Sequence, residues 1–98
     1  MIHHVSVECR IADRDAHRAF WTALGFSPVQ PPDALRDRAD WFEAGGTQLH
    51  LLWADDPVVP PQGHTAIRVA DHDAAVAALR DAGFTVRARA QHWGAPEP

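Results

Sequence analysis

Two of the seven histidines in this chain stand at matched positions. His4 opens the stretch HVSVECRIADRDA and His64 opens HTAIRVADHDAA, and both stretches run through aspartates into an alanine-rich segment. A histidine so placed can ligate a metal ion through its neutral imidazole, or it can be half-buried and hydrogen-bond a neighbouring backbone group. A single histidine would favour the second role, but the matched placement keeps both roles open.

The residues after each of these histidines alternate in polarity, which indicates a β-strand with two unlike faces. The mostly apolar faces carry Val5, Val7 and Cys9 in the first strand and Thr65, Ile67 and Val69 in the second. The opposite faces carry His4, Ser6 and Glu8 in the first strand and His64, Ala66 and Arg68 in the second. These opposite faces are therefore free to line a site.

Each strand leads into a predicted helix whose apolar residues recur at steps of three and four. Asp13 is expected to cap the first helix, and Asp71 or Asp73 the second. Gly25 and Gly83 are expected to end the helices, because glycine commonly follows the last helical turn. The echo between TALGF and RDAGF supports a repeated unit.

The remaining segments complete the first unit and begin to complete the second. Residues 26–30 predict a short strand, and residues 41–53 predict a hairpin that turns on Gly45 and Gly46. The charges of ALRDRAD, residues 34–40, indicate a solvated loop. Residues 54–63 carry three prolines and predict a linker, and residues 84–91 predict another strand.

The expected fold class is α+β, with two paired modules of the βαβββ type in a single domain. The first module spans residues 1–53, the linker spans 54–63, and the second module, incomplete at its C-terminal end, spans 64–98. A repeat of half the chain favours two modules about a pseudo-twofold axis over a solenoid, which needs three or more units. Two curved half-sheets facing each other would form a cup, so the duplication would supply two halves of one pocket.

The stretches HHVSVECRIADRDAHRAFWTALGF and GHTAIRVADHDAAVAALRDAGF resemble the vicinal oxygen chelate superfamily. This superfamily includes glyoxalases, extradiol dioxygenases and bleomycin-resistance proteins. The resemblance covers nearly the whole chain, and it implies paired βαβββ modules around a metal or ligand site. It does not specify a reaction, because this fold supports many reactions.

The resemblance also implies a metal site. His4 and His64 match ligand positions on the first strand of each module, and the fourth strand offers His50. The spacing from His4 to Asp13 is two residues longer than that from His64 to Asp71, so the count back from Asp13 puts Ser6 at the first position as an alternative. Three imidazoles suit a divalent ion such as Zn²⁺, Ni²⁺, Mn²⁺ or Fe²⁺. The family's last ligand, a glutamate after a DP-x-G turn, has no counterpart before Pro98, so the last two strands are expected to be missing.

Without that glutamate a proton-transferring enzyme would need another base within hydrogen-bond reach of its substrate. Glu8 is the candidate, although it could instead pair across the cup with Arg68. The expected substrate-binding residues are Ser6, Gln48, Trp41, Trp53 and Arg68. The tryptophans are included because ligand pockets are mostly apolar with a few polar groups.

Three functions stay open. The chain could be a metal-dependent lyase, isomerase or dioxygenase in which the ion polarises adjacent oxygens of a small substrate. It could be a metal-free protein that sequesters a small molecule, as bleomycin-resistance proteins do, or it could be an inactive incomplete module. The absent glutamate favours the last two functions, and the duplicated histidines favour the first.

The composition and charge of the chain bear on its partners and its cellular location. A net charge of −4 without a basic run argues against a nucleic-acid partner. No apolar run is long enough for a membrane span and no signal pattern is visible, and the single cysteine fits a reducing cytoplasm. The strand edge at TVRARAQ, residues 85–91, would lack a neighbour, so a homodimer is expected.

Overall fold

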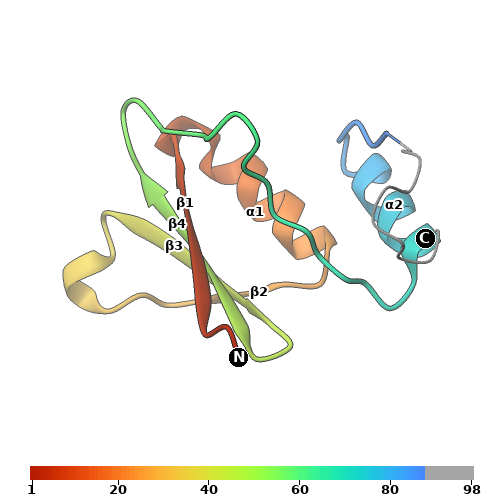
Figure 1. Cartoon of the computed structure of the whole chain (residues 1–98), viewed down its shortest axis with the longest axis horizontal. Helices are drawn as coiled ribbons and strands as arrows, with labels where there is room; N and C mark the ends of the chain where they lie inside the picture. Colours follow the sequence, from red (N-terminus) through yellow and green to blue (C-terminus); the bar gives the residue numbers. More distant parts are fainter. Residues whose placement is uncertain (88–98) are drawn as a thin grey trace.

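The computed structural model describes residues 1–87. The first module forms a four-stranded sheet with α1 (Arg14–Ala23) packed against one face (Figure 1). Its strands, β1 (His4–Cys9), β2 (Ser27–Val29), β3 (Ala39–Ala44) and β4 (Thr47–Trp53), lie in the order β1-β4-β3-β2. β1 runs parallel to β4, and the other neighbouring pairs are antiparallel. The predicted βαβββ pattern of this module is confirmed.

The core lies between α1 and the sheet. Five buried residues form its centre: Cys9, Trp21, Phe42, Leu49 and Leu51. Phe42 and Leu51 are 1% and 0% exposed, because the alternation along β3 and β4 points them at α1. Burial, followed by the charge of Asp13, raises the pKa of the Cys9 thiol, so Cys9 is a protonated core residue.

Both helices end in the same way. The amide of Gly25 donates to the carbonyl of Thr22 and that of Phe26 to Trp21, at 3.0 Å each. Such a pair of bonds defines a Schellman cap, which requires a positive φ at the glycine. In α2 (His72–Asp81) Gly83 and Phe84 make the equivalent bonds, and φ is 93° at Gly25 and 94° at Gly83. The predicted helix ends are confirmed.

The helix starts differ. The Asp71 carboxylate accepts a hydrogen bond of 3.0 Å from the amide of Ala74, which confirms the predicted cap of α2. Asp13 precedes α1 but makes no such bond, because it closes a short 3-10 turn, Ile11–Asp13. Neither helix described within residues 1–87 has the length and apolar character needed to cross a membrane.

The predicted strands of the second module are wrong as far as the structure describes them. Residues 64–69 and residues 84–87 form no strand. In the first module β1 gains its hydrogen bonds from the fourth strand, and residues 1–87 offer residues 64–69 no equivalent neighbour. The rest of the predicted strand at 84–91 lies outside the described residues, as does most of the edge on which the predicted homodimer rests.

Candidate functional site

The face of the sheet that turns away from α1 carries a stack of three aromatic rings. The ring centroids of Trp41 on β3 and His50 on β4 lie 3.9 Å apart, with 4° between the ring planes. The imidazole of His4 on β1 stacks on the other side of His50, with the ring centroids 4.2 Å apart and 16° between the ring planes. Trp41 and His50 are register partners, and His4 reaches His50 diagonally. The sheet thus brings together residues from three strands.

His50 is only 6% exposed between its two neighbours. Burial lowers the pKa of its imidazole below the usual range, and the nearby His4 and His3 lower it further. Its Nε2 lies 2.9 Å from Oε1 of Gln48, an amide oxygen that accepts hydrogen bonds. His50 is therefore neutral at pH 7 and bound to Gln48 through Nε2–H.

The three predicted metal ligands do not converge in this arrangement. The lone pairs of an imidazole lie in its ring plane, so the nearly parallel rings of His4 and His50 cannot both point at one ion between them. His64 instead has Nδ1 3.1 Å from the carbonyl of Gln62. Within residues 1–87 no group of three histidine, cysteine or acidic side chains is placed to hold a metal. The three-histidine site stays a prediction, and the residues as arranged do not fit the ion.

A cavity of about 660 Å³ lies between β1 and the chain at residues 58–65. Ser6 and Glu8 line one wall, and His64 lines the other. One oxygen of Glu8 accepts a hydrogen bond of 3.2 Å from the amide of Val58. Three of the predicted site residues, taken from both halves of the repeat, therefore meet in one cavity.

Two other predicted residues lie elsewhere. Trp53 packs against the core cluster, because it shares the helix-facing side of β4 with Leu49 and Leu51, while Trp41 lies on the opposite side of the sheet. Arg68 lines a separate cavity of about 370 Å³ beside Trp21 and Phe26. The structure thus places neither Trp53 beside Trp41 nor Arg68 in the cavity of Glu8.

The family model for the glyoxalase-like domain matches residues 5–96. The chain belongs to the glyoxalase-like domain family. A Bacillus anthracis protein, described as a candidate member of the glyoxalase family, has a crystal structure similar to this one, with a TM-score of 0.72 and 25% sequence identity. The similarity covers 85% of this chain and 70% of that protein. Among curated proteins no significant match is found.

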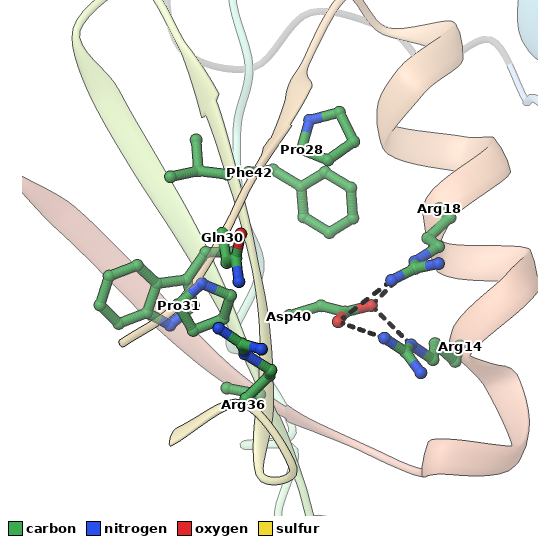
Figure 2. Close-up of a pocket in the computed structure, with 11 residues that line it drawn as sticks. Arg14, Arg18, Pro28, Gln30, Pro31, Arg36, Asp40 and Phe42 are labelled. Atoms are coloured by element: carbon green, nitrogen blue, oxygen red, sulfur yellow. Dashed lines mark hydrogen bonds and ion pairs between the residues drawn. The ribbon is translucent and has the colours of Figure 1, made fainter. Parts of the chain in front are cut away.

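Sequence reasoning missed one cluster of this glyoxalase-like chain. Asp40 is 6% exposed and sits between two arginines of α1, Arg14 and Arg18 (Figure 2). The prediction that residues 34–40 form a solvated loop is therefore wrong at its end, because β3 begins at Ala39. The available signal was the spacing of Arg14 and Arg18, which puts both on one side of a helix.

Proposed function

We propose that the chain binds a small molecule, without a metal ion, in the cavity between β1 and residues 58–65. The observation that carries this proposal is the meeting of Ser6, Glu8 and His64 in one space of about 660 Å³. Small-molecule sites measure roughly 300–1,000 Å³ and combine apolar walls with a few polar groups. Val58, Val59 and Pro60 supply the apolar wall.

The polar groups suggest the chemistry of the ligand. Glu8 is an acceptor when ionised, so it favours a ligand with N–H or O–H donors, or with a positive charge, at its side of the cavity. Ser6 can donate as well as accept. Val58 and Val59 are each 70% exposed, so an apolar ligand body that covers them would gain free energy from burial.

The same Glu8 could serve as a base toward a bound substrate, since it lies on the cavity wall. A hydrogen bond from the Val58 amide holds one of its carboxylate oxygens in place. This supports a positioned carboxylate and leaves the reaction open. The cavity therefore supports the binding of a small molecule, and Glu8 is the residue that a reaction there would use as its base.

The test is a fragment screen of the full, untagged chain by amide NMR, including donor-bearing and cationic fragments. We expect hits to shift the amides of Ser6, Glu8, Val58 and His64. Glu8→Gln should weaken donor-bearing hits about tenfold or more, since a hydrogen bond to a charged group contributes roughly 1.5–3 kcal/mol. Glu43→Gln is the matched control, because Glu43 is an exposed residue on β3 and does not line the cavity.

Two outcomes would contradict the proposal. Hits that map elsewhere, or that respond equally to Glu8→Gln and Glu43→Gln, would remove the cavity as the site. Stoichiometric Zn²⁺, Ni²⁺, Mn²⁺ or Fe²⁺ in the purified chain, lost in His64→Ala by elemental analysis, would replace metal-free binding with a metal site.

A further inference from the structure

A further cavity opens at the edge of the sheet opposite β1, where the pairing of β2 with β3 ends (Figure 2). β2 pairs with β3 only from Ser27 to Val29, so Ala39 and Asp40 extend beyond it. Gln30 and Pro31 follow the end of β2 and line a space of about 390 Å³ beside α1. Its size suits a small molecule rather than a macromolecular surface.

Asp40 holds two arginines at the wall of this cavity. Arg14 donates to both carboxylate oxygens at 3.0 and 3.1 Å, and Arg18 donates to them at 3.1 and 3.5 Å. Burial raises the pKa of Asp40, but the hydrogen bonds from Arg14 and Arg18 outweigh it, so the pKa lies below the usual range. Asp40 is therefore a carboxylate at neutral pH with its acceptor sites filled.

The cluster has more positive charge than the buried carboxylate requires. One arginine would neutralise Asp40, and the second leaves an unbalanced charge. Each guanidinium has five N–H donors, of which Asp40 takes two, so several remain unused on each. The side chains of Arg14 and Arg18 are 41% and 48% exposed, which leaves these donors within reach of a ligand.

A third cation and an apolar wall complete the cavity. Arg36 lines the cavity from the loop before β3. Its ion pair with Asp33 contributes little, because the Asp33 side chain is 92% exposed to solvent. Pro28 and Pro31 supply apolar surface to the lining of the cavity (Figure 2). The acidic neighbour Asp15 lies on the exposed side of α1 and does not line the cavity.

We propose that this cavity binds the oxyanion of a small organic acid, a carboxylate or a phosphate monoester attached to an apolar body. Arg14 and Arg18 would contact the oxyanion with their unused donors, in the forked geometry that suits planar carboxylates and phosphates. Arg36 would close the site from the loop, and Asp40 is a positioning residue that fixes both guanidiniums. The site is separate from the cavity at β1, and it stands or falls independently of the binding proposed there.

The test is calorimetric titration of the full chain with phenyl phosphate and benzoate, with phenol as the uncharged control. Arg18→Gln removes the surplus charge but leaves the Arg14 ion pair to satisfy Asp40. We expect it to weaken binding of both anions about tenfold or more, because a charged hydrogen bond contributes roughly 1.5–3 kcal/mol. Arg38→Gln, the same charge change at a residue outside the cavity, should change affinity less than about twofold.

Arg36→Gln provides a second variant on the exposed loop, where folding does not depend on a buried partner. It should also weaken both anions, and the urea midpoints of all three variants report whether each remains folded. The proposal is overturned if neither anion binds at millimolar concentration, if phenol binds as well as phenyl phosphate, or if Arg38→Gln matches Arg18→Gln. Weaker binding in folded Arg18→Gln and Arg36→Gln, with Arg38→Gln unaffected, would support it.

Discussion

Residues 4–26 and residues 64–84 share one pattern of strand, helix and glycine, but they reach different structures. The first segment forms β1, which joins the sheet, and α1, which packs on it. The second forms α2 after residues 64–69, which pair with no strand among residues 1–87. The two helix ends agree to 1° in φ at the glycine. Local signals therefore determine a helix and its cap, whereas a strand also depends on a partner elsewhere in the chain.

The same contrast separates how firmly the helices are held. α1 contributes Trp21 to the buried cluster and binds Asp40 of β3 through two arginines. Just after α2, the ring of Phe84 contacts the ring of Phe20 in α1 edge to face, with the ring centroids 5.3 Å apart. We therefore expect the sheet with α1 to be the stable unit and α2 to open at lower free energy.

The largest effect should come from Phe42→Ala. Phe42 is 1% exposed at the centre of the sheet core, so its truncation should lower the free energy of unfolding by about 3–5 kcal/mol. Leu79→Ala in α2, at a residue 8% exposed and outside that cluster, should cost about 2 kcal/mol, the low end for leucine. Urea unfolding followed by tryptophan fluorescence measures the loss in Phe42→Ala, because Trp21, Trp41 and Trp53 lie in α1 and the sheet, and hydrogen exchange in α2 measures the loss in Leu79→Ala. A loss of about 2 kcal/mol in the fluorescence transition of Leu79→Ala would mean that α2 and the sheet are one cooperative unit.

Asp40→Asn should cause the next largest loss of stability. It removes the ion pairs that join α1 to the sheet, for which α2 has no counterpart within residues 1–87. Removing the charge leaves Arg14 and Arg18 without their ion pair, which should cost about 1–3 kcal/mol at pH 7. The folded pKa of Asp40 is lowered, so this stabilisation is present above the ordinary aspartate value of about 3.9 and is lost as the pH falls toward the folded pKa. Urea midpoints of wild type and Asp40→Asn should converge below that pH, and a constant gap would contradict the assignment.

The fold could be predicted where the signal was local. Gly25 and Gly83 predicted the helix ends, and Gly45 and Gly46, with φ of 58° and 82°, predicted the hairpin. The site was harder, because it depends on register. Alternation along residues 47–53 puts Trp53 on the face opposite His50, but its position relative to Trp41 depends on the register of β3 with β4. The spacing of Arg14 and Arg18 did not reveal which carboxylate lies opposite them.

Gly25→Ala and Gly83→Ala should cost about 1 kcal/mol each at the helix end, because both glycines adopt a left-handed φ. A Cβ would meet nothing within 4 Å at either position, so the cost is purely one of backbone conformation. Gly25→Ala should lower the global free energy of unfolding, whereas Gly83→Ala should lower hydrogen-exchange protection in α2 alone. Loss of protection in the sheet of Gly83→Ala would show that the two segments do not open separately.

The smallest effect should distinguish the two helix starts. Asp71→Ala removes the carboxylate that accepts from the Ala74 amide, so α2 should lose about 0.5–1 kcal/mol of local stability. Asp13→Ala removes a carboxylate that makes no capping bond, so α1 should lose no more than its interaction with the helix dipole, about 0.3 kcal/mol. Hydrogen exchange at the first amides of each helix measures both. Equal losses would indicate that Asp13 stabilises the start of α1 as much as Asp71 stabilises the start of α2. The 3-10 turn before α1 would then not replace a capping side chain.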